Sequence, residues 1–332
     1  MSLPDRDLRQ LRRERERGRR AAVRRRRAGV AAAFAAVVIA IVVAVAASDG
    51  GSRSSTPTTG QRLASRTDRD AKPRHSASTP RSSTTTAKGT GVPGNATVPI
   101  LMYHVINPPP ASAPYPGLYV PASEFTAQMQ ALKAAGWHAV TMDQLEANWT
   151  RGVSLGPGKP IVLSFDNGYE SQYTNALPVL KRLGWVGVEN IQLSGLPPSQ
   201  GGLTDGQVRG LLAAGWELDT QGISHADLIT LDAAGLRYQI DSARQTLRQR
   251  YGVPVNWFCY PSGQYNATVI AAVRAAGFVG STTVVPGWAR RSDDPFRLPR
   301  LRVLGGTSPS SLLAQIDGAE SSPEPPTSYG SA

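Results

Sequence analysis

The stretch KPIVLSFDNGYE, Lys159–Glu170, joins an apolar run to a carboxylate, an amide and a glycine. Residues 161–163 are short, unbroken and mostly β-branched, which is typical of a buried parallel strand. Gly168 supplies a permissive turn after which we expect a helix to begin. Polar side chains at the end of such a strand face a pocket, so Asp166 and Asn167 are candidates for a functional site.

The same alternation of apolar strand, loop and amphipathic helix runs through residues 97–306. Strands are predicted at Val98–Tyr103, His138–Met142, Pro160–Phe165, Val186–Gln192, Glu217–Gln221, Asn256–Tyr260 and Gly277–Thr282. Helices are predicted at Ala122–Ala135, Tyr169–Leu183, Asp205–Ala214, Asp232–Tyr251 and Ala267–Ala276, with Ser123 and Thr204 as N-caps. This order predicts an α/β fold with a mainly parallel sheet, closed into a distorted (β/α) barrel. The polar residues at the carboxyl ends of these strands are His104, Asp166, Asn167, Gln221, His225 and Tyr260.

The chain of 332 residues has a formal charge of +12, concentrated before the predicted barrel. Residues 1–27 contain 12 arginines and four acidic residues, which is compatible with a nucleic-acid arm. Residues 28–47 contain no charge and span about 30 Å as a helix, however, so we expect one transmembrane helix behind a basic cytoplasmic tail. Cleavage as a signal peptide after this segment stays open. We therefore expect no nucleic-acid partner and a single-pass protein of a bacterial cell membrane, with its C-terminal domain extracellular.

Residues 48–96 are rich in Ser, Thr, Gly, Arg and Pro and contain few large apolar residues. Such a segment cannot bury enough surface to offset its ordering entropy, so it predicts a disordered linker. Residues 307–332 form a C-terminal tail with one short helical pattern at 310–316, followed by a stretch that we expect to be disordered. Cys259 is the sole cysteine, which excludes an intramolecular disulfide.

The stretch from residue 159 resembles the first signature of the polysaccharide deacetylase family, the NodB homology domain. Its usual form is a Thr/Ser-Phe-Asp-Asp-Gly run, here Ser164-Phe-Asp-Asn-Gly168. By this resemblance Asp166 is the general base. Asn167 stands where the family carries a metal-binding Asp.

Two further signatures of the family have counterparts in this sequence. The His-Ser/Thr-x-x-x-His signature aligns with Gln221-Gly-Ile-Ser-His225, and the Arg-x-Pro-Tyr/Gly signature with Phe258–Gly263, where Cys259 replaces Arg. Leu101-Met-Tyr-His104 matches the Met-Tyr-His start of the branch that acts on poly-N-acetylglucosamine and related exopolysaccharides. By that resemblance His104 is the general acid.

The resemblance implies a divalent metal, zinc or a similar ion, held by one Asp and two His. The corresponding positions here are Asn167, Gln221 and His225. Two neutral amides and one imidazole suit zinc poorly, so we expect a degenerate metal site with weak or absent binding, through His225 if at all. The resemblance further places Tyr260 and Pro261 in the substrate groove, and we add the loop aromatics Tyr265 and Trp288 as platforms for a sugar ring.

Each of these residues also has a purely structural interpretation. Asp166 can cap the helix that follows it, His104 can be a hydrogen-bonded histidine at the barrel mouth, and His225 can orient the next loop. Aromatic residues such as Tyr265 and Trp288 more often belong to a core than to a sugar platform.

Two functions follow from the resemblance. The first is a membrane-anchored hydrolase of carbon-nitrogen (non-peptide) bonds that removes acetyl groups from a cell-wall or exopolysaccharide glycan such as peptidoglycan. The alternative is a pseudoenzyme that binds the glycan without metal-dependent turnover, because Asn167 and Gln221 replace two expected ligands.

Overall fold

The computed structural model describes residues 89–194, 196 and 201–330, which all belong to the unit Thr79–Ala332. The predicted basic tail, the apolar segment 28–47 and the linker up to residue 88 lie outside this range. Within the described residues, no helix combines the length and apolarity needed to cross a membrane.

The centre of the fold is a nine-stranded sheet whose strand order is β7-β6-β5-β4-β3-β1-β8, with β2 added to β3 and β9 added to β1. The strands are β1 Val98–Tyr103, β2 Trp137–Val140, β3 Lys159–Asn167, β4 Val188–Ile191, β5 Glu217–Thr220, β6 Trp257–Cys259, β7 Gly280–Thr282, β8 Trp288–Ala289 and β9 Leu301–Arg302. All strand pairs are parallel except that of β1 with β8. The parallel α/β architecture predicted from the sequence is thus confirmed.

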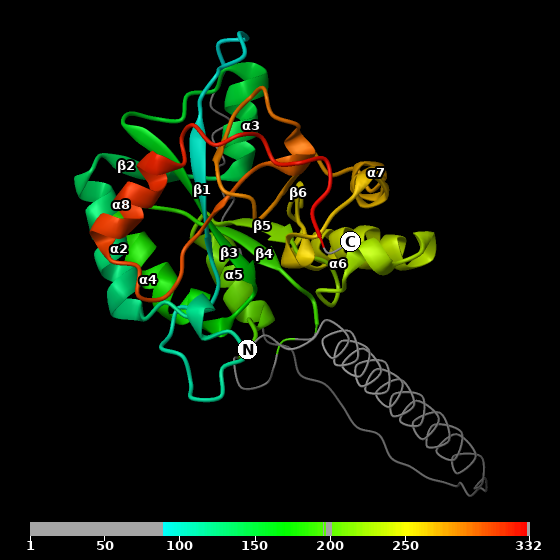
Figure 1. The fold of residues 1–332 in the computed structure, drawn as a ribbon, viewed down its shortest axis with the longest axis horizontal. Helices are drawn as coiled ribbons and strands as arrows, with labels where there is room; N and C mark the ends of the chain where they lie inside the picture. Colours follow the sequence, from blue (N-terminus) through cyan, green and yellow to red (C-terminus); the bar gives the residue numbers. More distant parts are fainter. Residues whose placement is uncertain (1–88, 195, 197–200, 331–332) are drawn as a thin grey trace, which may run out of the picture. The chain divides into compact units, whose positions relative to one another are not determined.

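Helices surround the strands, with α2, α4 and α8 on one side and α6 and α7 on the other (Figure 1). Their bounds are α2 Ala122–Ala134, α3 Met142–Arg151, α4 Leu177–Leu183, α5 Asp205–Ala213, α6 Ala233–Tyr251, α7 Ala267–Ala275 and α8 Pro309–Gly318. Short helical turns occur at Gln172–Ala176, Pro116–Leu118, Leu228–Thr230, Pro261–Gly263 and Pro295–Arg297. The turn Gln172–Ala176 is π-helical and replaces the first part of the single helix expected there.

Side chains alternate along β1 and β3, so these strands contribute to two hydrophobic clusters, one on each face of the sheet. Tyr103 and Phe165 point toward the helices, where their rings lie 5.7 Å apart beside Phe125. Val162 points the other way and packs with apolar residues inside the barrel. Because side chains two residues apart share a face of a strand, Asp166 lies on this inner face, at the carboxyl end of β3.

The segment 298–302 connects the two edges of the sheet. The backbone N–H of Leu298 donates to Ser281 O and that of Arg300 to Val285 O, while Leu301 and Arg302 pair with β1. The strands therefore form an α/β half-barrel, and this irregular segment runs between its β7 side and β1. The segment carries the side chain of Arg300 into the half-barrel, where it is fully buried.

Several predicted elements differ from the structure. The helix α3 is not predicted, although Thr141 and Gln144 form a capping box at its start. The α2 N-cap is Pro121 and not Ser123, which lies inside the helix, whereas Thr204 caps α5 as predicted.

The C-terminal tail also differs from its prediction, since its residues up to 330 follow a defined path on the barrel. Tyr329 pairs with Tyr265 through backbone hydrogen bonds, and Arg297 forms an ion pair with Glu324. These contacts offset the entropy lost when the tail is ordered, and they cannot be inferred from its Ser-, Pro- and Glu-rich composition.

Candidate functional site

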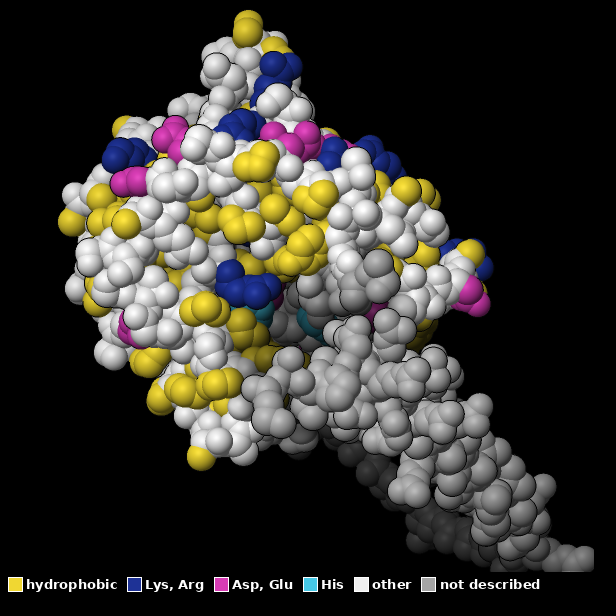
Figure 2. Space-filling model, viewed as in Figure 1, with side chains coloured by type: hydrophobic (Ala, Val, Ile, Leu, Met, Phe, Trp, Pro, Cys, Tyr) yellow, Lys and Arg dark blue, Asp and Glu magenta, His cyan; other side chains and the backbone are white. Residues whose placement is uncertain are grey.

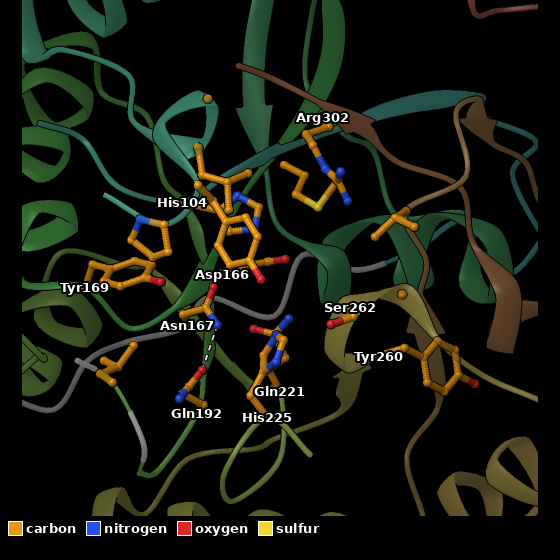
Figure 3. Close-up of a pocket in the computed structure, with 18 of the residues that line it drawn as sticks. His104, Asp166, Asn167, Tyr169, Gln192, Gln221, His225, Tyr260, Ser262 and Arg302 are labelled. Carbon is orange, nitrogen blue, oxygen red and sulfur yellow. Dashed lines mark hydrogen bonds between the residues drawn. The ribbon is translucent and has the colours of Figure 1, made fainter. Parts of the chain in front are cut away.

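A pocket of about 810 Å³ opens at the carboxyl ends of the strands (Figure 3). It brings together the sequence-predicted residues His104, Asp166, Asn167, Gln221, His225 and Tyr260. Its remaining lining includes Met102, the loop at 114–118, the turn at 262–263, Arg302 and Leu304. Residues from across the predicted barrel thus meet in one cavity.

Asp166 is held by a fully buried guanidinium. Arg300 Nη1 lies 2.7 Å from Asp166 Oδ1 and Arg300 Nη2 lies 2.9 Å from Oδ2, a two-point charge-assisted contact. Asn190 Nδ2 also donates to Oδ1 at 2.9 Å. Burial alone raises the pKa of Asp166, but Arg300, His104 and Asn190 together lower it to about 2. The carboxylate is therefore charged at neutral pH and has its negative charge matched by Arg300.

Cys259 completes this buried cluster. Arg300 Nη2 donates to Cys259 Sγ at 3.1 Å, and the thiol donates to Asp166 Oδ2 at 3.4 Å. Burial raises the pKa of the thiol, so the cysteine stays neutral. By the resemblance, Cys259 occupies the signature position where many members of the family carry Arg. In this structure the guanidinium beside Asp166 comes from Arg300, 134 positions further along the chain.

Asn167 is tied to a second amide. Its Nδ2 donates to Gln192 Oε1 at 2.7 Å (Figure 3). Gln192 Nε2 in turn donates to Ser194 O at 2.7 Å. The backbone at Asn167 has φ 79°, a left-handed conformation that Asn tolerates better than most residues. This chain of amides fixes the side chain that stands in the place of the expected metal-binding Asp.

Gln221 and His104 line the pocket, and each has a buried polar atom without a partner in the described part of the chain. Gln221 Oε1 and His104 Nδ1 are buried and have no hydrogen-bond partner among the described residues. Burial lowers the pKa of His104 to about 4 despite the opposing field of Asp166, so its ring is neutral at pH 7. Burial likewise lowers the pKa of His225. This residue lies in the loop after β5, and its backbone has a φ of 54°. Buried polar atoms without partners are uncommon, and at the wall of a pocket an ordered water or a ligand can satisfy them.

The residues at the expected metal positions do not fit a divalent cation. Within the described part of the chain, no group of three or more His, Cys, Asp or Glu side chains is placed to hold one. Both oxygens of the nearest carboxylate, Asp166, are bound by Arg300. The donors that remain are two amides and His225, which offer no charge to offset the desolvation of a metal ion.

The predicted groove residues divide into two sets. Tyr260 lines the pocket with its main chain, but its hydroxyl donates to Phe296 O and its ring turns away from the cavity (Figure 3). Pro261 is buried directly before Ser262 and Gly263, which do line the pocket. The structure therefore assigns the Tyr-Pro-Ser-Gly turn to the wall of the pocket through its backbone and Ser262.

Neither of the two loop aromatics lies in the pocket. Tyr265 is buried, stacks on Tyr260 with ring centroids 4.9 Å apart, and donates its hydroxyl to Pro326 O in the tail. Trp288 donates its indole N–H to Ile316 O and packs edge-to-face on Trp137. Both belong to the packing of the barrel, so their expected place as sugar platforms is corrected.

The exposed aromatic at the pocket is Tyr115, which is 70% exposed and lines the opening. It lies in a proline-rich loop for which the sequence offers no periodic signal. Among the residues of this site to which the sequence assigned no role are Tyr115, Gln192, Arg300 and Arg302.

The fold and the site define an α/β half-barrel with a polar pocket at the carboxyl ends of its strands. Residues 155–281 match the family model described as polysaccharide deacetylase. The chain thus carries a polysaccharide deacetylase domain, and the resemblance of its signatures is confirmed.

One curated protein is similar in sequence to this chain, and two solved structures are similar in fold. The "Putative polysaccharide deacetylase YxkH" of Bacillus subtilis (strain 168) is 27% identical over 222 residues, covering 67% of this chain and 77% of the relative. The fold is similar to that of the Streptococcus pyogenes deacetylase PplD in complex with acetate, with a TM-score of 0.61, 24% identity and coverage of 67% of this chain and 98% of that one. It is also similar to IcaB from Ammonifex degensii, with a TM-score of 0.55, 22% identity and coverage of 67% and 97%.

Proposed function

We propose that this protein binds an acetylated glycan in the pocket and does not perform metal-dependent deacetylation. The observation that carries the proposal is the replacement of metal-ligand positions by amides, of which Asn167 is fixed by Gln192 and Ser194. Because Gln192 fixes the Asn167 amide by a hydrogen bond, this position differs from a metal site that lacks only its ion.

The pocket retains the features that a sugar chain requires. Gln221 Oε1 is a buried acceptor without a partner, suited to a sugar hydroxyl or an acetamido N–H. Tyr115 provides an exposed ring and Leu304 an apolar side chain at the opening, suited to the apolar face of a pyranose. The volume of about 810 Å³ is within the range of ligand sites in proteins.

A second candidate is metal-free deacetylation by Asp166 and His104. Their electrostatic coupling favours it, because Asp166 raises the pKa of His104 and His104 lowers the pKa of Asp166. Against it stand the Arg300 contacts on both Asp166 oxygens and the low pKa of His104, which leave neither a free base nor a protonated acid at pH 7.

One experiment separates the two candidates. The full chain is incubated with chitooligosaccharides, peptidoglycan and acetylated xylan, with and without divalent metal, and both acetate release and binding are measured. We expect binding without acetate release. Acetate release that requires added metal would overturn the proposal, and release without metal would support the second candidate.

A variant pair links the binding to this pocket. Gln221→Met removes the amide while retaining its shape, and no described side-chain hydrogen bond of Gln221 is lost. We expect weaker glycan binding by this variant and unchanged binding by Tyr238→Ala, whose ring is 57% exposed on α6. Equal affinity of both variants would place the binding elsewhere.

For the chain before the barrel, we propose a retained membrane anchor at residues 28–47 and a tether at 48–96 that presents the barrel outside a bacterial cell. The basis is the uncharged apolar run after an arginine-rich tail. The N-terminal sequence of the protein recovered from a membrane fraction tests this, since a chain that begins after Ala47 would contradict a retained anchor.

A further inference from the structure

Arg302 places an unmatched positive charge in the pocket. Its side chain extends from β9 toward the cavity (Figure 3), and a Lys or Arg side chain lies beside the hollow in which His side chains are visible (Figure 2). None of the ion pairs among the described residues involves Arg302.

The register of β9 explains why this side chain faces the cavity. Leu301 pairs with Leu101, and both pack in the core between strands and helices. Arg302 pairs with Met102, and both line the pocket. Since side chains alternate along a strand, burial of Leu301 directs Arg302 to the pocket side.

No other charge in the pocket offsets Arg302. Asp166 is the sole Asp or Glu among its lining residues, and its charge is already matched by Arg300 behind it. The two histidines of the lining are neutral at pH 7 because burial lowers the pKa of each. The pocket therefore has a net positive charge on its wall and a neutral polar floor.

We propose that the pocket selects an acidic glycan, in which an N-acetylated sugar lies beside a unit carrying a carboxylate, and that Arg302 binds this carboxylate. The inference rests on the proposed glycan-binding function and names its ligand class. A guanidinium forms two parallel hydrogen bonds with a carboxylate, whereas it gains no ion pair from a neutral sugar. Gln221 Oε1 and the ring of Tyr115 serve the uncharged part of the same ligand.

Two oligosaccharides that differ in their acidic units test the inference. Hyaluronan tetrasaccharide alternates N-acetylglucosamine with glucuronic acid, and chitotetraose contains N-acetylglucosamine alone. We expect the full chain to bind hyaluronan tetrasaccharide more tightly, and Arg302→Gln to reduce that affinity about tenfold, as for loss of one charge-assisted contact. Affinity for chitotetraose should stay within about twofold, and Arg302→Lys should restore part of the hyaluronan affinity.

The control variant accounts for the arginines of residues 1–27, which attract any polyanion. Arg237→Gln removes an exposed charge from α6 and leaves the pocket intact. Because the basic tail is the same in both variants, a loss seen with Arg302→Gln and not with Arg237→Gln belongs to the pocket.

The outcomes distinguish this inference from the proposed function. Binding of both oligosaccharides with equal affinity, unaffected by Arg302→Gln, would overturn the acidic ligand and leave glycan binding in place. Binding of neither would overturn both. Equal losses in the two arginine variants would assign the effect to general charge and also overturn the inference.

Discussion

Asn167 Nδ2 lies 2.7 Å from Gln192 Oε1, and this contact ties the altered metal position to the residue that directly follows β4. Gln192 is oriented by its own donation to Ser194 O. The oxygen of Gln192 therefore faces position 167, where it accepts from an amide. A carboxylate at position 167 would bring two oxygens together.

We expect Asn167→Asp to lower the free energy of unfolding by about 1–3 kcal/mol at neutral pH, because it replaces a buried hydrogen bond by an unpaired charge. Asp tolerates the positive φ at this position about as well as Asn, so backbone strain does not explain the loss. Urea unfolding of Asn167→Asp, Gln192→Ala and the double variant measures the coupling. Purely additive effects would show that the contact has no energetic role.

Metal content provides a second prediction. We expect the purified full chain to retain no stoichiometric zinc, cobalt or nickel after dialysis, because the described residues offer no three-ligand group. Asn167→Asp combined with Gln221→His creates a carboxylate and two imidazoles with His225, and this double variant should retain about one metal ion per chain. Adding Gln192→Ala should strengthen binding by removing the opposing oxygen.

Elemental analysis decides both parts of the metal prediction. One tightly bound ion in the unaltered chain would contradict the first part. A folded double variant without metal would show that the geometry at 167, 221 and 225 no longer supports coordination.

The sequence predicts the barrel well because buried parallel strands produce uninterrupted apolar runs. The predicted strand Val98–Tyr103 matches β1, and 160–165 falls within β3. The polar residues predicted at the strand ends do line one pocket, because the carboxyl ends of parallel strands lie at the same edge of the sheet. The helix α3 was missed although the capping-box residues Thr141 and Gln144 are visible in the sequence.

The partners inside the site could not be predicted because no local pattern records them. Arg300 reaches Asp166 only because an irregular segment runs between β7 and β1. Gln192 meets Asn167 through strand pairing 25 positions away. Whether a loop aromatic is exposed also depends on distant parts of the chain. Tyr265 is covered by the C-terminal tail, for which the composition predicts disorder.

The buried ion pair gives a prediction for acid stability. Arg300→Met should lower the free energy of unfolding by about 3–5 kcal/mol at pH 7, because it leaves the Asp166 carboxylate buried and unpaired. The pKa of Asp166 is lowered to about 2, so its contribution is present above the ordinary pKa near 3.8 and is lost as pH falls toward 2. The difference between the two proteins should therefore shrink in acid.

Unfolding by urea at pH 7 and pH 3 checks this dependence. Arg250→Met is the matched control, because Arg250 pairs with Asp205 at the surface and water screens the pair. A loss for Arg300→Met that does not change with pH would assign its effect to packing and not to charge.

Glu189 gives the opposite dependence. Both of its carboxylate oxygens are buried without a hydrogen-bond partner among the described residues. Burial, and then the field of Asp166, raise its pKa well above the ordinary value. Stability from a neutral Glu189 is therefore fully present below pH 4.5, the ordinary pKa, and is lost as pH rises through the raised pKa.

We expect Glu189→Gln to remove this loss, so that the variant gains stability relative to the unaltered chain as pH rises from 5 to 9. Urea unfolding at both pH values measures the difference, with the exposed Glu320→Gln as control. A stability difference that is the same at pH 5 and pH 9 would show that Glu189 does not titrate in this range.

Tyr115 and Tyr265 separate glycan recognition from barrel packing. Tyr115 is 70% exposed at the pocket opening, whereas Tyr265 is 1% exposed and stacks on Tyr260. Tyr115→Ala should reduce chitooligosaccharide affinity about three- to tenfold through loss of a ring contact, with little change in stability. Tyr265→Ala should cost about 3–5 kcal/mol of stability through its cavity, and leave the affinity of the folded fraction unchanged. A loss of affinity confined to Tyr265→Ala in fully folded protein would return Tyr265 to the glycan site and remove Tyr115 from it.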